Sequence, residues 1–213
     1  MKDTYRHKGL RQKLIDSLKN KGIENQEVLD AMNNIPRHLF MDSGFLDHSY
    51  VDKAFPIASG QTISQPYTVA FQTSLLQVQK HHKILEVGTG SGYQTAVLIE
   101  LGARVFTIER IRELYQAARE LLASMGYKPS FHYGDGYNGL PAYAPFDRIL
   151  VTAAAGEVPE NLLGQLAVGG RMVIPVGNRL GQKMLVIEKE DEEKYNRTEH
   201  GMFSFVPLIK GKL

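Results

Sequence analysis

Apolar side chains near the start of the chain recur at intervals of three and four residues. These positions are Leu10, Leu14, Ile15 and Leu18. Such spacing predicts an amphipathic helix, and Gly22 is a residue type typical of the end of a helix. A second short helix is predicted around residues 28–32, before Pro36, because a residue that precedes proline avoids the helical conformation. Residues 1–58 are therefore predicted to form an N-terminal helical extension.

Residues 60–176 alternate short apolar runs with amphipathic segments. The predicted strands are Lys83–Val87, Arg104–Ile108, Ser130–Tyr133, Arg148–Thr152 and Arg171–Pro175. The predicted helices are Thr95–Leu101, Ile111–Met125 and one around Pro159–Leu166. This alternation is typical of a parallel sheet that is covered by helices on both faces.

The pattern changes in residues 177–213. Two strand-like runs, Lys183–Glu188 and Met202–Leu208, flank a polar, charge-dense segment that reads as a turn. Two strands joined in this way predict an antiparallel pair at the edge of the sheet. The sequence thus predicts one α/β domain across residues 1–213, with a mostly parallel sheet and antiparallel C-terminal edge strands.

Composition narrows the possible functions. The 25 Lys and Arg residues nearly balance the 23 Asp and Glu residues, so nucleic acid and acidic membrane are not expected as partners. The absence of cysteine excludes disulfides, thiolate metal sites and cysteine nucleophiles. The seven histidines show no ligand-like spacing, so no metal site is expected. With no signal peptide or membrane-length apolar run, the protein is predicted to be a cytoplasmic monomer.

A glycine-rich loop gives the strongest local signal. Gly88, Gly90 and Gly92 follow a predicted buried strand and precede a predicted helix. Glycine lets the backbone approach a ligand closely, and the start of a helix offers free amides. A dinucleotide fingerprint requires a further glycine where this chain has Tyr93, so the loop is a poor match to a pyrophosphate site. The spacing suits a ligand with a nucleoside and an amino-acid tail.

Two acidic residues follow the loop in an order that suits a nucleoside. Glu109 ends the next predicted strand, where a carboxylate can accept both hydroxyls of a ribose. Asp135, with Gly136 after it, ends the strand after that and could accept the exocyclic amine of an adenine. Taken singly, the first could be a surface charge beside Arg110, and the second a plain Asp-Gly turn. Together with the glycine loop they favour a nucleoside site.

The residues resemble a known family. Glu86–Gly92, Glu109 and Asp135 resemble the cofactor site of Rossmann-like S-adenosylmethionine-dependent methyltransferases. Gly60–Pro66 resembles the signature of the protein-L-isoaspartate O-methyltransferase family. Further similar segments occur in order along nearly the whole chain: Tyr50, Asp52, Phe55–Ile57, Val151–Ala154, Gln165–Leu166, Gly169–Gly170, Ile174–Gly177 and Phe205–Leu208. The chain departs from the family at Phe55, where Leu is more usual, and at Ile209, where Thr is frequent.

This resemblance implies a reaction and a set of site residues. The enzyme would transfer a methyl group from S-adenosylmethionine to the α-carboxylate of an L-isoaspartyl residue, and the ester would then close to a succinimide whose hydrolysis partly restores aspartate. Ser64 would lie beside the acceptor carboxylate, as the catalytic residue. The residues implied to line the cofactor cleft are Gln61, Thr62, Ile63, Glu86, Gly88, Thr89, Gly90, Gly92, Glu109, Asp135 and Gly136. Among them, Glu86 and Gly88 would approach the methionine end, Glu109 the ribose, and Asp135 with Gly136 the adenine.

The chemistry needs few specialised groups. A carboxylate with a pKa of about 4 is already ionised at neutral pH, so its methylation by direct displacement requires no general base. Ser64 would then orient the acceptor by a hydrogen bond rather than attack it. An alternative interpretation makes Ser64 the N-cap of a helix that begins near Pro66.

Three other functions compete with this interpretation. A methyltransferase for RNA or a small molecule would share the glycine loop, but the basic excess is confined to the N-terminal helix. A nicotinamide oxidoreductase is disfavoured by Tyr93 and by the lack of a recognisable hydride-transfer site. A binding protein that has lost catalysis is disfavoured by the presence of Ser64, Glu109 and Asp135.

Overall fold

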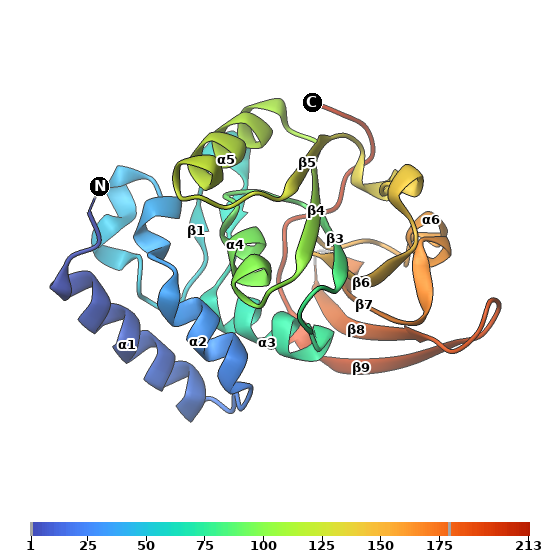
Figure 1. Ribbon diagram of the computed structural model, residues 1–213, viewed down its shortest axis with the longest axis horizontal. Helices are drawn as coiled ribbons and strands as arrows, with labels where there is room; N and C mark the ends of the chain where they lie inside the picture. Colours follow the sequence, from blue (N-terminus) through green and yellow to red (C-terminus); the bar gives the residue numbers. More distant parts are fainter. Residues whose placement is uncertain (1, 179) are drawn as a thin grey trace.

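Seven strands form one mixed sheet at the centre of the computed structural model, which describes residues 2–178 and 180–213 (Figure 1). Positions 1 and 179 of the predicted domain lie outside these residues. The order is β5-β4-β3-β6-β7-β8-β9. The strands are β3 (Lys83–Val87), β4 (Arg104–Glu109), β5 (Ser130–Tyr133), β6 (Phe146–Val151), β7 (Leu166–Asn178), β8 (Gly181–Lys189) and β9 (Tyr195–Phe203). Pairs from β5 through β7 are parallel, whereas β7–β8 and β8–β9 are antiparallel, which confirms the predicted fold class.

Helices surround this sheet, and a small hairpin lies beside it. The helices are α1 (Tyr5–Asn20), α2 (Gln26–Asn34), α3 (Pro66–Leu76), α4 (Tyr93–Glu100), α5 (Arg112–Ser124) and α6 (Glu160–Gly164). Short 3₁₀ turns are η1 (Arg37–Phe40), η2 (Ser43–His48), η3 (Ala58–Gly60), η4 (Gly136–Asn138) and η5 (Pro141–Tyr143), and the hairpin pairs β1 (Phe55–Pro56) with β2 (Thr62–Ile63). None of the helices in the described part of the chain has both the length and the apolar character needed to cross a membrane.

The N-terminal helices share a hydrophobic core with the helices of the α/β unit. Leu18 of α1 and Leu29 of α2 are wholly buried in one cluster with Val97 of α4 and Leu122 of α5. On the opposite side, α6 buries Leu162 against strand residues in a second cluster. Because burial of a leucine contributes about 1.5–3 kcal/mol, these contacts hold the extension firmly on the sheet's helical layer.

Local sequence explains how α1 and α2 begin. The Thr4 hydroxyl accepts a hydrogen bond from the His7 amide, and the His7 ring accepts one from the Thr4 amide, which forms a reciprocal cap. The Asn25 side chain accepts from the Val28 amide at 3.1 Å. Both caps supply acceptors for amides that have no partner inside the helix.

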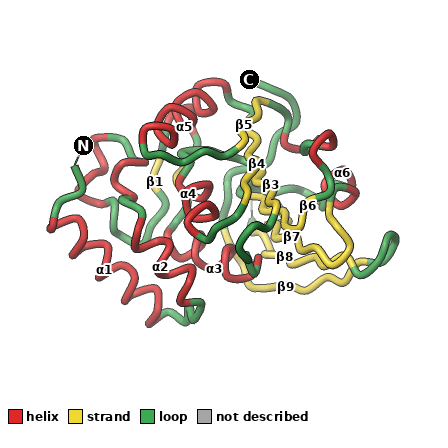
Figure 2. Tube along the Cα trace, viewed as in Figure 1, coloured by secondary structure: helices red, strands yellow, loops and turns green. Residues whose placement is uncertain are grey.

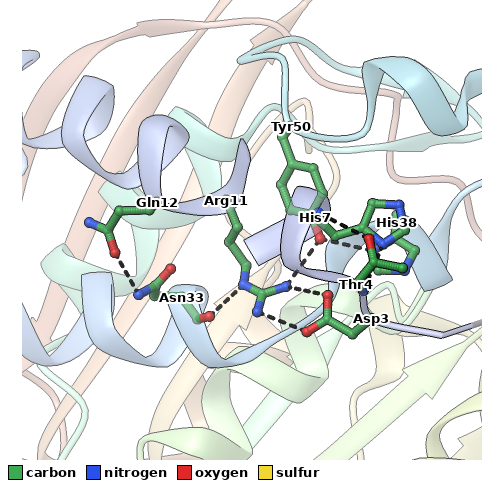
Figure 3. A network of polar contacts seen from close by, with 8 residues as sticks. All are labelled: Asp3, Thr4, His7, Arg11, Gln12, Asn33, His38 and Tyr50. Carbon is green, nitrogen blue, oxygen red and sulfur yellow. Dashed lines mark hydrogen bonds and ion pairs between the residues drawn. The ribbon is translucent and has the colours of Figure 1, made fainter. Parts of the chain in front are cut away.

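A polar network fastens α1 to α2 and to the loop before β1 (Figure 3). Arg11 of α1 is 6% exposed and forms a two-point ion pair with Asp3, at 3.0 and 3.2 Å. Its guanidinium also donates to the Tyr50 hydroxyl at 3.2 Å and to the Asn33 carbonyl. The Tyr50 hydroxyl lies 2.8 Å from His38 Nδ1. Every buried polar group named here has a partner except His38 Nε2, which is buried without one among the described residues, so most of the desolvation cost of the network is offset.

The same region corrects the expectation that the histidines gather no ligand cluster. His7 and His38 are distant in sequence, yet their rings lie beside Asp3 with centroids 3.8 Å apart and planes tilted by 32°. The Asp3 carboxylate is occupied by Arg11, and His38 Nδ1 by Tyr50. Packing of α1 on η1 brings these groups together, which the spacing along the chain could not indicate.

The structure also corrects the C-terminal edge. The last strand, β9, begins in the segment predicted to be a turn and ends at Phe203, so it shares only Met202 and Phe203 with the predicted strand Met202–Leu208. Its pairing with β8 places Lys189 opposite Tyr195, so only a short turn joins them. Most side chains of this edge strand are in solvent, so its sequence does not alternate apolar and polar residues. For this reason its polar sequence predicted a loop. Figure 2 shows residues after β9 as an irregular segment that runs back across the sheet ends toward β5; Ala154 bridges Pro207 on this path.

Two helical predictions also change. The helix expected around Pro159–Leu166 is the shorter α6, since Leu166 already begins β7. The helix α3 was predicted only as a helix that begins near Pro66, in the alternative interpretation of Ser64, and its mixed composition places polar Gln72 and Thr73 in the buried interior. The Gln72 amide donates to the Val151 carbonyl at 3.1 Å, which satisfies a polar group that periodicity assigns to the surface.

Candidate functional site

One cavity lies at the carboxyl ends of β3, β4 and β6 and is bounded on another side by the β2–α3 segment. In open α/β sheets this edge is where ligands bind. The cavity brings together most of the residues predicted from the sequence: Gln61, Thr62, Ile63, Ser64, Gly88, Thr89, Gly90, Glu109 and Gly136. The side chains of Glu86 and Asp135, and Gly92, are not part of its lining.

Gly88 follows β3 and lies close to Thr152, which follows the neighbouring strand β6. Its φ of +97° lies in the left-handed region that favours glycine. A Cβ built there would lie 2.4 Å from the Thr152 hydroxyl, which donates to the Gly88 carbonyl at 2.6 Å and the Val87 carbonyl at 3.0 Å. The loop therefore leaves no room for a side chain, and Thr152 holds its main chain in place.

Glu109 is built into the glycine loop. It is 5% exposed, and its two carboxylate oxygens accept hydrogen bonds from the Gly90 and Ile111 amides, each at 2.9 Å. Each oxygen keeps a further lone pair, so the carboxylate can still accept from a ligand. The predicted residue thus fixes the loop that it adjoins and also faces the cavity.

Glu86 lies beneath the loop. It is fully buried on β3, and the Thr95 hydroxyl of α4 donates to its Oε2. Its Oε1 has no hydrogen-bond partner among residues 2–178 and 180–213. Burial, aided by the like charge of Glu109, raises the pKa of Glu86 to about 7. The predicted contact of this residue with the methionine end of the cofactor stays a prediction.

Replacing Glu86 with glutamine is expected to stabilise the protein increasingly as pH rises. The folded protein holds the Glu86 proton more tightly than an unfolded carboxyl with pKa 4.5, so the wild type loses stability between about pH 4.5 and 7. Glutamine has no such proton, and its advantage should approach about 3 kcal/mol at the upper end of that range. Urea unfolding at about pH 5 and about pH 8 measures this difference. The exposed Glu120→Gln is the control, and a Glu86→Gln effect that did not change with pH would contradict the assignment.

Gly92 and Asp135 lie outside the lining of the cavity, and their predicted contacts with the cofactor stay predictions. Gly92, at φ +85°, is the N-cap of α4, and a Cβ there would lie 2.9 Å from Leu122. Asp135 accepts from the Tyr137 amide at 2.9 Å and from the Gly211 amide at 2.7 Å. It therefore ties the C-terminal segment to the end of β5. A Cβ on Gly136 would lie 2.6 Å from Val87, so this position of the cavity lining leaves no room for a side chain.

Ser64 lies where the β2–α3 segment crosses the cavity. The helix α3 begins at Pro66 with Gln65 as its N-cap, so the alternative interpretation of Ser64 as the N-cap is wrong. Asp52 caps the helix instead, because its Oδ1 accepts from the Tyr67 amide at 2.8 Å. The Gln65 side-chain Nε2 donates to the Asp52 backbone carbonyl at 3.2 Å, which fixes the residue after Ser64.

A second hollow opens beside the first. Its walls include the aromatic residues Tyr67, Phe71, Phe203 and Phe205, with Met202. It shares Thr62, Ser64, Thr152 and Val206 with the first cavity. Ser64 is therefore positioned between a glycine-lined cavity and a larger, more open groove with a largely apolar wall.

Several residues that line the cavity were not predicted from the sequence. Tyr93, Thr152, Ala153, Arg110, Ile111 and the segment Val206–Ile209 all contribute to the lining. Similarity to the family had marked residues 151–154 and 205–208, but it assigned them no role. Ile209, the departure from the family pattern, is 45% exposed at the rim.

The residues present fit S-adenosylmethionine. A glycine cradle that a Cβ would fill lies beside a carboxylate able to accept from ribose hydroxyls. Ile108, Ile111 and Leu208 give the cavity an apolar wall suited to a purine face. The loop's non-glycine at Tyr93 is buried and packs on Phe40, with ring centroids 5.5 Å apart, and does not open a pyrophosphate cradle.

Comparison with known proteins agrees with this site. The family model described as Protein-L-isoaspartate(D-aspartate) O-methyltransferase (PCMT) matches residues 9–213. A protein-L-isoaspartate O-methyltransferase from Christiangramia forsetii is 60% identical over 213 residues, which is 100% of both chains.

Solved structures give the same result. One protein-L-isoaspartate O-methyltransferase has a TM-score of 0.84 at 29% identity, over 92% of this chain and 65% of that one. Another, from Plasmodium falciparum in complex with S-adenosyl-L-homocysteine, has a TM-score of 0.82 at 26% identity, over 96% of this chain and 99% of that one. The predicted family, methyltransferase fold and cofactor are thereby confirmed. This chain belongs to the protein-L-isoaspartate(D-aspartate) O-methyltransferase family.

Proposed function

We propose that this protein transfers a methyl group from S-adenosylmethionine to the free α-carboxylate of L-isoaspartyl residues in damaged proteins and peptides, which starts their repair through a succinimide. The observation that carries this proposal is the junction at Ser64. A glycine-lined cavity and an open groove meet there, sharing Thr62, Thr152 and Val206. Donor and peptide acceptor can thus approach the same serine from two sides.

The reaction places modest demands on the chain. S-adenosylmethionine, when bound, supplies an electrophilic methyl group on a sulfonium. Glu109 and the amides of the glycine loop would hold the nucleoside, and Ser64 would orient one oxygen of the acceptor. The acceptor is ionised at neutral pH, so no side chain has to remove a proton. The protein contributes mainly alignment and the exclusion of water.

We further propose that residues 1–213 act as one domain, with the N-terminal extension shaping the site that the core provides. Support comes from the hydrophobic core shared by α1, α2, α4 and α5 and from the Asp52 cap on α3. A monomer in the cytoplasm, acting on protein rather than on nucleic acid or membrane, stays the prediction from composition. Size-exclusion chromatography with light scattering tests the monomer.

One peptide in two forms tests the reaction. Labelled S-adenosylmethionine is offered with a synthetic peptide that carries either aspartate or isoaspartate at one position. Base-labile label on the isoaspartyl form alone is the expected result. Binding of S-adenosylhomocysteine without methylation of either peptide would favour a different methyltransferase or a silent binding protein.

The change Ser64→Ala is expected to lower turnover about tenfold while leaving the affinity for S-adenosylhomocysteine within about twofold. A hydrogen bond to a charged acceptor is lost, whereas the glycine loop and Glu109 are untouched. Initial rates with the isoaspartyl peptide and calorimetry with S-adenosylhomocysteine measure the two effects. Ser59→Ala is the control, because Ser59 lies on η3 and donates to Glu113 at 2.6 Å outside the cavity. Unchanged turnover in Ser64→Ala would remove this residue from the site.

A further inference from the structure

An arginine of the N-terminal extension lies directly behind the site. Arg37, on η1, is 1% exposed. Its Nη2 donates to the Ser64 carbonyl at 2.9 Å, and its guanidinium carbon lies 4.7 Å from the centroid of the Tyr93 ring. Both Ser64 and Tyr93 line the cavity. Arg37 thus contacts both Ser64, in the segment between β2 and α3, and Tyr93, the first residue of α4.

The charge of Arg37 has no counter-ion in the described part of the chain. No ion pair there includes it, and its Nε and Nη1 are buried without hydrogen-bond partners. Asp52 is the carboxylate that acts on it electrostatically, but the Asp52 Oδ2 already pairs with Lys21 at 2.7 Å. Burial lowers the pKa of Arg37, as expected for a cation deprived of solvent. An arginine nevertheless remains protonated in a protein.

Such an arrangement costs free energy, because buried charges are ordinarily paired. Arg11, the other deeply buried arginine of this region, shows the ordinary solution, since Asp3 neutralises it. A neutral donor could make the single bond from Arg37 to the Ser64 carbonyl equally well. The positive charge therefore requires a reason beyond the positioning of that carbonyl.

We propose that Arg37 is a positioning residue whose buried positive charge selects an acceptor that carries a carboxylate and holds that carboxylate at Ser64. This inference rests on the proposed function, because it takes the negatively charged α-carboxylate of the isoaspartyl residue as the missing counter-ion. An acceptor carboxylate would accept a hydrogen bond from the Ser64 hydroxyl, and Arg37 donates to the backbone carbonyl of the same serine. Charges interact strongly across a region of low dielectric even without direct contact.

Arg110 is the cation that lines the cavity itself, and it is the main alternative source of attraction. Its Nε donates to the Gly211 carbonyl at 3.0 Å, so the C-terminal segment engages it. It also follows Glu109 at the end of β4, on the side assigned to the ribose, whereas Arg37 is bonded to Ser64. This geometry favours Arg37 as the partner of the acceptor.

The test compares two peptides that differ in one charge. The first carries isoaspartate, and the second carries isoasparagine, whose α-carboxamide replaces the α-carboxylate. Calorimetry measures the affinity of each for the protein saturated with S-adenosylhomocysteine. The ratio of the two affinities is determined in the wild type, in Arg37→Met and in Arg37→Lys. Arg148→Met is the matched control, because Arg148 is a half-buried arginine that donates to the Leu76 carbonyl at 2.8 Å, outside the residues that line the cavity.

We expect Arg37→Met to reduce the preference for the carboxylate by roughly tenfold or more, with Arg37→Lys intermediate and Arg148→Met unchanged. If Arg37 had only a structural role, Arg37→Met would weaken the binding of both peptides equally and leave the ratio of their affinities at the wild-type value. This result would overturn the proposal. Affinity for S-adenosylhomocysteine and the melting temperature verify that each variant is folded.

A measurement on the wild type keeps the proposal testable if Arg37→Met does not fold. Salt screens exposed charges much more than buried ones. The affinity ratio should therefore change by less than about twofold between about 50 mM and about 500 mM salt. If high salt instead brings the ratio of the two peptide affinities close to one, surface cations cause the preference for the carboxylate. That result would contradict the role of Arg37. Failure of the proposed function would appear separately, as a wild type that does not methylate the isoaspartyl peptide.

Discussion

Replacing Gly88 with alanine is expected to weaken binding of S-adenosylhomocysteine by roughly a hundredfold, or about 3 kcal/mol. The left-handed backbone at this position costs an alanine about 1–2 kcal/mol. The new methyl group would also lie 2.4 Å from the Thr152 hydroxyl. Thr152 can yield only by giving up its bonds to the Val87 and Gly88 carbonyls. The loop would therefore shift into the cavity, and the melting temperature should fall as well.

Calorimetric titration with S-adenosylhomocysteine and thermal unfolding measure the two effects. Gly44→Ala is the control, because a Cβ there meets nothing within 4 Å. A second variant, Gly88→Ala combined with Thr152→Ala, removes the clash but not the backbone strain. We expect it to recover part of the lost affinity. An affinity of Gly88→Ala equal to that of the wild type would show that this turn does not approach the ligand.

The change Glu109→Ala is expected to weaken binding of the same ligand by about 1–3 kcal/mol through unpaired ribose hydroxyls alone. The structure adds a second loss, because the Gly90 and Ile111 amides would each lose a buried acceptor. The effect should therefore lie at the upper end of this range. It should also include a loss of stability, since buried donors without partners are costly.

Glu109→Gln separates the two contributions. Its amide keeps one acceptor oxygen for the loop but removes the charge and one acceptor, so an intermediate affinity is expected. Glu120→Ala on the exposed face of α5 is the control. A calorimetric affinity in Glu109→Ala equal to that of the wild type would refute the ribose assignment. A loss of stability without any loss of affinity would leave Glu109 with a structural role only.

Several features of this protein follow from short stretches of sequence. The alternation of apolar runs and amphipathic segments predicted the parallel strands β3 to β7, because helix and strand periods are local properties. The spacing of Gly88, Gly90 and Gly92 predicted a close turn, and all three have positive φ values. Glu109 was predicted as the end of β4 beside this turn, because parallel strands align their carboxyl ends.

Local patterns failed where burial or pairing overrides them. The polar strand β9 is held by its hydrogen-bonded neighbour β8 rather than by an apolar face. The buried amide of Gln72 in α3 is accommodated because the Val151 carbonyl accepts from it. Val151 is 79 residues from Gln72, and the pairing of β9 with β8 leaves no apolar alternation in β9 itself, so a window of a few residues contained neither signal.

The amino-acid sequence by itself thus determined the fold class, the glycine loop and the positions of Glu109 and Asp135 at the ends of successive strands. Only the tertiary structure decided that Ser64 lies between two hollows, that Asp52 rather than Ser64 caps α3, and that Thr152 closes on Gly88. It also decided that the positive charge of Arg37 is buried behind Ser64 without a counter-ion in the described residues. The physical reason is that propensity and periodicity act between neighbours along the chain. Caps, close contacts and unpaired buried charges arise from groups that packing alone brings together.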